Sequence, residues 1–116
     1  MAKSYRELLV WQRAIELSVA LYKLTQDFPR EEIYGLTSQL RRAGVSVASN
    51  VAEGYGRASK ADYRNFLRMA RGSVLEVQTQ LVIARELGYG DSARITKAEG
   101  LSEEAGKMLW AMIQKL

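Results

Sequence analysis

Apolar residues recur at spacings of three and four along most of the chain, which is the period of an amphipathic helix. Four segments show this pattern, at about residues 5–26, 29–53 and 59–87, and from Asp91 or Ser92 onward. Only short connections separate them, and we see no linker between domains. The pattern predicts an all-α protein in which residues 1–116 form one antiparallel, up-and-down four-helix bundle.

The residues between these segments are ones that begin or end helices. Pro29 disfavours helix in the residue before it, and Ser59 with Asp62 has the spacing of a capping box at the start of the third segment. Asp91 or Ser92 caps the fourth. The remaining signals are glycines that end the second and third segments, namely Gly54, Gly56, Gly88 and Gly90.

The first segment is apolar around more of its circumference than one bundle seam requires. One stripe comprises Leu8, Trp11, Ile15, Val19 and Tyr22, and a second comprises Val10, Ala14, Leu17, Leu21 and Leu24. We therefore expect part of this surface to meet another subunit, with Trp11, Leu17 and Leu21 as candidates for packing or subunit contact. The inward face of the second segment is predicted to be Ile33, Leu36, Leu40, Ala43, Gly44, Val47, Ala48 and Val51, whose small members allow close approach of a neighbouring helix.

Composition removes most catalytic chemistry. The 116 residues include no cysteine and no histidine, which excludes disulfides, thiolate nucleophiles, the commonest metal ligand and the commonest general base. Glu7, Glu16, Glu53 and Glu76 are scattered singly along the predicted helices. We expect a protein that is not an enzyme, without cofactor, metal or small-molecule substrate. No stretch approaches the roughly 20 apolar residues of a membrane span, so we also expect a cytoplasmic protein that does not contact membranes.

The positive charge is concentrated in the middle of the chain. Residues 41–71 carry seven basic and two acidic residues, a balance of +5, whereas the rest carries ten basic and eleven acidic residues, a balance of −1, which together give the net charge of +4. Four of the cations, Lys60, Arg64, Arg68 and Arg71, share one side of the predicted third helix. Arg57 is expected to extend this line.

Such a line of cations suits a phosphate backbone. The alternative is a solvated face on which some cations pair locally with Asp62 or Glu53. Farther along the same side, Leu75 and Val82 replace the cations. They are expected either to contact a neighbouring protomer or to belong to a wide core face of the monomer.

A polar group is expected where the second helix ends. Asn50, Glu53 and Arg57 lie close in sequence to Tyr55, and Asn, Arg and Tyr can contact or stack on bases. We favour the alternative that they end the helix and form hydrogen bonds across a subunit contact. The two glycines around Tyr55 match neither a dinucleotide-binding fingerprint nor a phosphate-binding loop.

Taken in order, several segments resemble one family, the four-helix-bundle 23S rRNA intervening-sequence proteins. The most distinctive strings are YGLTSQLRRA at residues 34–43 and SNVAEGYG at residues 49–56. The other matching segments are residues 9–14, 22–25, 28–29, 63–67, 70–73, 76–81 and 87–89. The sequence departs from the family at Ala48, where proline is common.

The resemblance implies a homopentameric ring with a positively charged central channel. It also implies either an orphan encoded within ribosomal RNA intervening sequences or a relative of the accessory variability determinants of diversity-generating retroelements, which bind nucleic acid and reverse transcriptase. The nucleic-acid contacts that it suggests here are Arg41, Arg42, Arg57, Arg64, Arg68 and Arg71. Candidates for packing or subunit contact are Trp11, Asn50, Glu53 and Tyr55.

Two functions are therefore expected. The first is an oligomeric scaffold that binds RNA or DNA through its basic surface, with little sequence readout. The second is a protein-interaction module that docks a partner such as a reverse transcriptase and uses its arginines in ion pairs between subunits.

Overall fold

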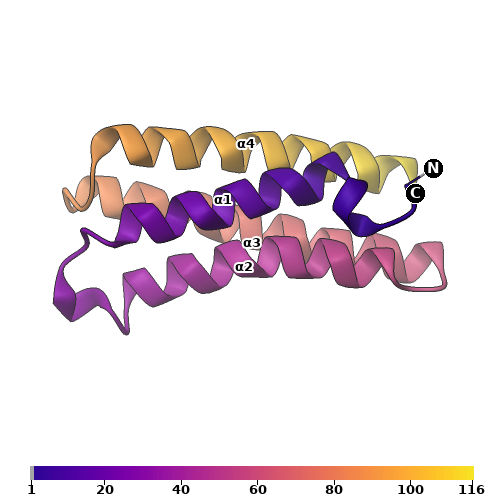
Figure 1. Ribbon diagram of the computed structural model, residues 1–116, viewed down its shortest axis with the longest axis horizontal. Coiled ribbons are helices and arrows are strands. Elements are labelled where there is room, and N and C mark those ends of the chain that lie inside the picture. Colours follow the sequence, from indigo (N-terminus) through magenta and orange to yellow (C-terminus); the bar gives the residue numbers. More distant parts are fainter. Residues whose placement is uncertain (1) are drawn as a thin grey trace.

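Four long helices form an antiparallel bundle in the computed structural model, which describes residues 2–116. They are α1 (Leu9–Thr25), α2 (Leu36–Tyr55), α3 (Lys60–Glu86) and α4 (Ser92–Lys115), and the short 3-10 helices η1 (Tyr5–Glu7) and η2 (Arg30–Glu32) precede α1 and α2. Consecutive helices run in opposite directions, so both termini lie at one end (Figure 1). The predicted all-helical, up-and-down arrangement of four helices is confirmed.

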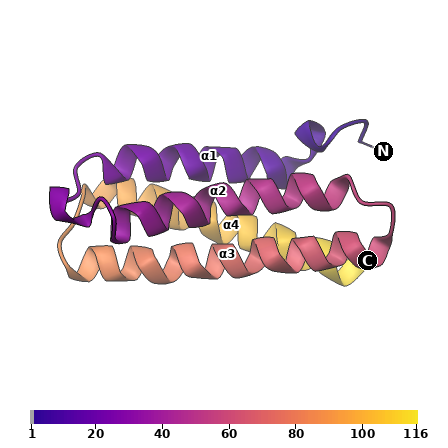
Figure 2. The same cartoon turned by 90° about the horizontal axis from the view of Figure 1, so that it is seen from below.

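Each helix packs against two neighbours. Helices α1 and α3 both contact α2 and α4, so α2 lies between α1 and α3 in the view of Figure 2. The bundle measures 43 × 24 × 21 Å. One face of α3 is consequently left for solvent or a partner, flanked on one side by α2 and on the other by α4.

The core is a continuous apolar interior to which all four helices contribute. Leu21, Leu40, Leu81 and Ile95 represent its half near the α1–α2 connection, and Val47, Leu67, Val74 and Leu109 represent the half near the termini; these eight side chains are at most 2% exposed.

The second apolar stripe of α1 provides that helix's share of the core. Leu17 and Leu21 are fully buried within the protomer. Our suggestion that they contact another subunit is therefore wrong, because neither has any surface left for a neighbour, and their role is packing.

Most helix ends follow the predicted signals. The Ser59 hydroxyl accepts a hydrogen bond from the Asp62 N–H at 3.1 Å, and the Asp91 carboxylate accepts from the Ala93 and Arg94 N–H groups. After α3, Gly88 adopts a φ of +72°, and the N–H of Tyr89 donates to the carbonyl of Ala84. This αL turn satisfies the last carbonyls of α3 and reverses the chain.

The start of α2 differs from the prediction. Residues 30–32 form one 3-10 turn, and the α-helix begins only at Leu36, whose N–H donates to the Glu32 carboxylate at 3.1 Å. Ile33 consequently lies outside the helix and is 54% exposed, so its assignment to the inward face is wrong. At the other end α2 continues through Gly54 to Tyr55, two residues beyond the predicted end.

Gly44 of α2 permits a close helix contact, as predicted, whereas Gly54, which was predicted to end the helix, lies within it and permits a second one. A Cβ atom at Gly54 would lie 2.7 Å from Cβ of Phe66 on α3, and one at Gly44 would lie 2.7 Å from Cδ1 of Leu21 on α1. Both distances are shorter than real carbon contacts. Glycine at these positions therefore sets how closely α2 approaches its two neighbours.

Candidate nucleic-acid interface

Four cations follow one side of α3 without acidic partners. Lys60, Arg64, Arg68 and Arg71 span about 16 Å of helix at a rise of 1.5 Å per residue. Lys60 and Arg68 are exposed, whereas the other two are half-buried. Within residues 2–116 no Asp or Glu side chain lies within ion-pairing distance of any of them, since the salt bridges there involve other arginines. Local pairing with Asp62, one of our alternatives, is therefore not found.

Two of these four cations turn toward α4. Arg64 donates a hydrogen bond from Nη2 to the backbone oxygen of Leu116, directly after the end of α4. The guanidinium carbon of Arg71 lies 4.8 Å from the ring centroid of Trp110. Arg64 thus has a structural role at the negative end of the α4 dipole, and Arg71 is held by cation–π stacking.

The other predicted contacts lie elsewhere. Arg57 does not extend the line, because its guanidinium lies 4.7 Å from the ring of Phe66, on the side of α3 that faces α2. Arg41 stacks on Tyr22 at 4.6 Å and donates to Thr25 of α1.

Arg42 borders a polar pocket between α2 and α3. Arg41 and Arg42 are separated from the α2–α3 turn by about two thirds of the length of α2, about 20 Å. The seven basic residues therefore do not form one surface.

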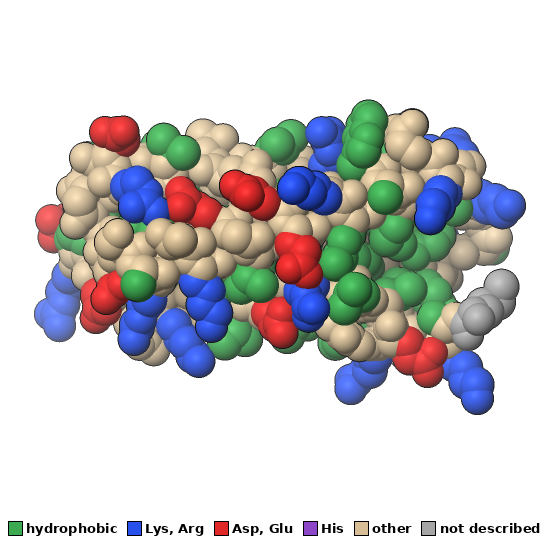
Figure 3. All heavy atoms as spheres, turned by 90° about the horizontal axis from the view of Figure 1, so that it is seen from above, with side chains coloured by type: hydrophobic (Ala, Val, Ile, Leu, Met, Phe, Trp, Pro, Cys, Tyr) green, Lys and Arg blue, Asp and Glu red, His purple; other side chains and the backbone are tan. Residues whose placement is uncertain are grey.

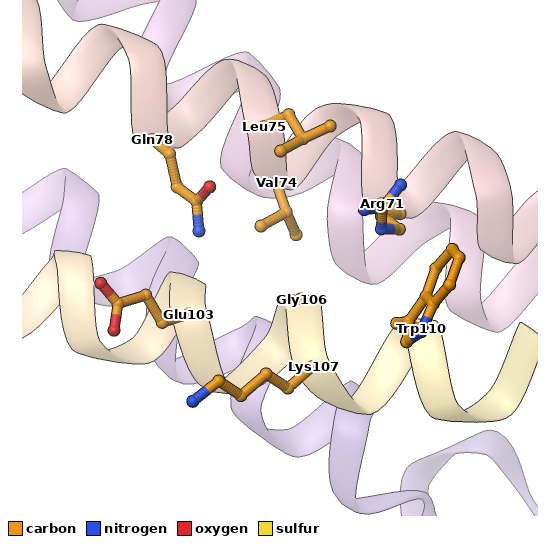
Figure 4. A pocket seen from close by; sticks show the side chains of 8 residues that line it. All are labelled: Arg71, Val74, Leu75, Gln78, Glu103, Gly106, Lys107 and Trp110. Carbon is orange, nitrogen blue, oxygen red and sulfur yellow. The ribbon is translucent and has the colours of Figure 1, made fainter.

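A groove between α3 and α4 adjoins the line of cations. It has a volume of about 420 Å³, and we call it the α3–α4 groove; its lining is Arg71, Val74, Leu75, Gln78, Glu103, Gly106, Lys107 and Trp110. Figure 4 shows Trp110 next to Arg71 at one end, with Gln78 and Glu103 facing each other across the other. Trp110 and Lys107 were not predicted as site residues. The available signal was that Trp110 falls outside the spacing of three and four that the buried residues of α4 share, namely Ile95, Ala98, Ser102, Ala105, Leu109 and Ile113.

Leu75 and Val82 are 49% and 55% exposed, so the alternative that they belong to a wide monomer core is wrong. Part of the first α1 stripe, Ile15, Val19 and Tyr22, is also exposed. Ile15 and Val19 border a groove of about 320 Å³ between α1 and α4. The bundle thus leaves apolar surface on two sides, and contact with another protomer there stays a prediction.

The residues near the end of α2 do not form one hydrogen-bonded group. Asn50 donates to the carbonyl and hydroxyl oxygens of Ser46, and Glu53 is exposed. The Tyr55 hydroxyl donates to the backbone oxygen of Ala2, and its ring lies 6.2 Å edge-on from Tyr63.

Burial, and secondarily the neighbouring Tyr55, raise the pKa of Tyr63. Trp11 packs edge-on against Tyr5 at 5.2 Å. Trp11 and Tyr55 are therefore packing residues within the protomer, and a role in subunit contact is untested.

A polar seam joins α2 to α3. The Ser73 hydroxyl donates to that of Ser46 at 3.0 Å, and the amide of Gln80 lies 3.5 Å from that of Gln39. Gln80 is 9% exposed, and its Oε1 atom has no hydrogen-bond partner among residues 2–116. This seam is less completely paired than the rest of the interior.

The face over α4 differs from the α3 line because both signs of charge are interspersed on it (Figure 3). Arg13 of α1 pairs with Glu104 of α4 and, at 3.3 Å, with Glu16. The hydrogen bond to Glu104, followed by the charges of both carboxylates, raises the pKa of Arg13. Arg13 is thus neutralised locally, whereas Lys60, Arg64, Arg68 and Arg71 pair with no Asp or Glu side chain of residues 2–116.

Two searches of the described chain are negative. Residues 2–116 contain no cluster of three or more Asp, Glu, His or Cys side chains that could hold a metal ion. None of the helices in that range has both the length and the apolar character of a transmembrane segment.

Fold and surface together define a small four-helix-bundle protein with an unpaired basic line and exposed apolar strips. The family model for 23S rRNA-intervening sequence proteins matches residues 6–111, and the chain belongs to that family. A crystal structure from Bacteroides thetaiotaomicron, described as a protein with unknown function from the S23 ribosomal protein family, has the same fold. It aligns with a TM-score of 0.81 and 23% identity over 90% of this chain and 98% of that chain. No curated protein matches.

Proposed function

We propose that this chain is a non-catalytic, oligomeric scaffold that binds RNA or DNA through the cations of α3. One observation carries the proposal: Lys60, Arg64, Arg68 and Arg71 lie on one side of one helix, and no Asp or Glu side chain of residues 2–116 pairs with them. Unpaired cations in a row bind a phosphate backbone favourably because they release the counterions condensed on the nucleic acid. The affinity of such binding depends on the charge of the backbone and not on the base sequence.

The expected salt dependence follows from the number of contacts. Four phosphate contacts per protomer give a slope of about −3.6 in log affinity against log salt for a duplex. Raising the salt from about 50 to about 200 mM then weakens binding roughly 100-fold. An assembly that presents several copies of α3 to one nucleic acid gives a steeper slope.

Assembly is proposed from the exposed apolar strips. Leu75 and Val82 lie on the same side of α3 as the cations, and Ile15, Val19 and Tyr22 are exposed on α1. Burying such strips against other copies removes apolar surface from water. The family resemblance implies a ring of five protomers, and light scattering after size exclusion measures the number.

Lys60→Glu combined with Arg68→Glu tests the proposal. Both side chains are exposed, whereas Arg64 holds the end of α4 and is a poor choice for charge reversal. The matched control reverses two exposed lysines beside the α1–α4 groove, Lys23→Glu with Lys97→Glu. We expect only the α3 variant to lose nucleic-acid binding, while the oligomer stays intact. Equal loss in both variants would contradict a localised site.

The apolar strip beside the unpaired cations also favours a second candidate function. In a protein-interaction module, Leu75 and Val82 would contact a protomer or a partner such as a reverse transcriptase, and the arginines would pair with its carboxylates. In that case the α3 charge reversal disrupts the assembly itself, and the wild type ignores nucleic acid at every salt concentration.

A further inference from the structure

We infer that the α3–α4 groove is a stacking site for an unpaired base, so that the nucleic acid bound by this chain is single-stranded. The inference rests on the proposed function and names its substrate class. It draws on the aromatic side chain, the floor and the charge distribution of the groove.

The groove presents one aromatic side chain in a fixed position. Trp110 is 51% exposed although it lies in the body of α4, and Arg71 from α3 packs on its ring at 4.8 Å. This contact immobilises the indole before any ligand arrives. One turn earlier, Gly106 has no side chain, and a Cβ atom there would lie 3.4 Å from Cγ1 of Val74. The groove is therefore open down to an apolar floor, which leaves room for the flat ring of a base.

The arginine end of the groove is the more basic one, since Lys107 of α4 lies near Glu103 at the other end. Arg71 marks the end from which Arg68, Arg64 and Lys60 continue along α3 toward the α2–α3 turn (Figures 1 and 4). Glu103, the one carboxylate in the lining, lies at the other end. A nucleotide has the matching polarity, because its phosphate is anionic and its base is neutral. Phosphates are thereby directed toward the arginines and the base toward Gln78 and Glu103.

This arrangement favours a single strand over a duplex. Bases in a duplex are stacked on each other and cannot enter a groove between two helices, whereas an unpaired base can stack on an aromatic ring. From Arg71 to Lys60 the helix spans about 16 Å, a length along which several phosphates of an extended strand can lie. One base in the groove and the following phosphates on α3 therefore fit one continuous strand.

The polar end of the groove also favours certain bases. A carboxylate only accepts hydrogen bonds, so Glu103 pairs with the exocyclic amino group of adenine, cytosine or guanine. Uracil and thymine have no exocyclic amino group and offer a carboxylate only the ring N3–H. We expect oligo(A) and oligo(C) to bind more tightly than oligo(U) or oligo(dT), with the difference reduced in Glu103→Ala.

The test compares two exposed aromatic residues. Trp110→Ala is measured against Tyr34→Ala, which removes a 95% exposed ring near the α1–α2 connection. The probes are labelled RNA and DNA oligonucleotides of about 12 residues, within known site sizes, and a duplex of equal length. We expect Trp110→Ala to bind single strands about 5- to 150-fold more weakly, the range of base–aromatic stacking, and Tyr34→Ala to match the wild type. Loss with RNA alone or with DNA alone identifies which strand is bound.

A second measurement does not depend on the alanine variant folding. In a Trp11→Phe background Trp110 is the single tryptophan of the chain. A base stacked on its ring quenches its fluorescence, so single strands quench and the duplex does not. Shielding of Trp110 from acrylamide in the free protein would overturn the inference, because the groove would already be covered.

The remaining outcomes distinguish a failure of the groove inference from a failure of the proposed function. If Trp110→Ala binds single strands as tightly as the wild type while the Lys60 and Arg68 charge reversal abolishes binding, the groove inference is wrong and the proposed function stands. If the wild type binds no nucleic acid at low salt, both are wrong.

Discussion

Glycine-to-alanine substitutions at two positions test the close approach of α2 to α3. At Gly54 an added Cβ would lie 2.7 Å from Cβ of Phe66 and 3.3 Å from the backbone oxygen of Tyr63. Both atoms are fixed to the α3 backbone, so relief requires the two helices to separate by up to about 1 Å from their present spacing. At Gly72, in the middle of α3, an added Cβ has no neighbour within 4 Å among the described residues.

The same chemical change should therefore have opposite effects. Alanine gains about 1 kcal/mol of helix propensity over glycine, and overpacking costs about 1–3 kcal/mol. Gly72→Ala should raise the free energy of unfolding by up to about 1 kcal/mol. Gly54→Ala should lower it by up to about 2 kcal/mol, because the overpacking cost exceeds the propensity gain.

Urea denaturation followed by far-UV circular dichroism measures both changes at one fixed protomer concentration, since oligomerisation would otherwise shift the midpoints. Gly100→Ala, exposed on α4 with no atom of the described chain near its Cβ position, is the matched control and should behave as Gly72→Ala does. If Gly54→Ala stabilises the protein as much as these two variants do, the helices are not as close as described and the reasoning fails.

Three further substitutions test individual contacts. Ser59→Ala removes the cap of the Asp62 N–H and should cost about 1 kcal/mol in the free energy of unfolding. In Gln80→Met an apolar side chain replaces a buried amide whose Oε1 atom is unpaired, so the bundle should be stabilised by about 1 kcal/mol. If the amide pairs with another protomer, the oligomer weakens instead. Tyr89 donates to the Glu32 carboxylate at 3.0 Å, and this bond raises its pKa above the usual 10.0. Because the pKa of Tyr89 is raised in the folded state, the hydrogen bond to Glu32 contributes fully to stability below pH 10, and this contribution is lost as the pH rises through the folded pKa. Tyr89→Phe should therefore lose less stability at alkaline pH.

Local signals predicted most of the helix boundaries because capping is a local interaction. Ser59 and Asp91 cap N–H groups two or three residues away, so their roles follow from sequence spacing alone. The start of α2 could not be found in this way. Glu32 accepts hydrogen bonds from Leu36 and from Tyr89, which is 57 residues away. Acidic residues after Pro29 suit the first turn of an α-helix and a 3-10 turn equally well.

Periodicity found both apolar stripes of α1 but could not rank them. Leu17 and Ile15 belong to stripes of similar hydrophobicity, and only the positions of α2 and α4 decide that Leu17 is buried and Ile15 exposed. The α3 cations were placed correctly relative to each other because one helix fixes their angles. Arg57 precedes α3, so a helical projection does not apply to it. The contact between Arg71 and Trp110 depends on the register of α3 against α4, and this register cannot be predicted from residue spacing within either helix.

Stacking gives arginine a property that lysine lacks at position 71. A guanidinium packed flat on a ring keeps its in-plane N–H donors free for a phosphate, whereas an ion pair would occupy them. The Arg71 guanidinium lies over the Trp110 ring, 4.8 Å from its centroid, and Arg68 on the same side of α3 lies over no ring of the described chain. Arg71→Lys keeps the charge but loses the fixed plane, so we expect about 2- to 5-fold weaker binding, the value of an exposed cation–π contact, with an unchanged salt slope. Arg68→Lys should bind as the wild type does, and equal effects of the two substitutions would show that charge alone matters at this surface.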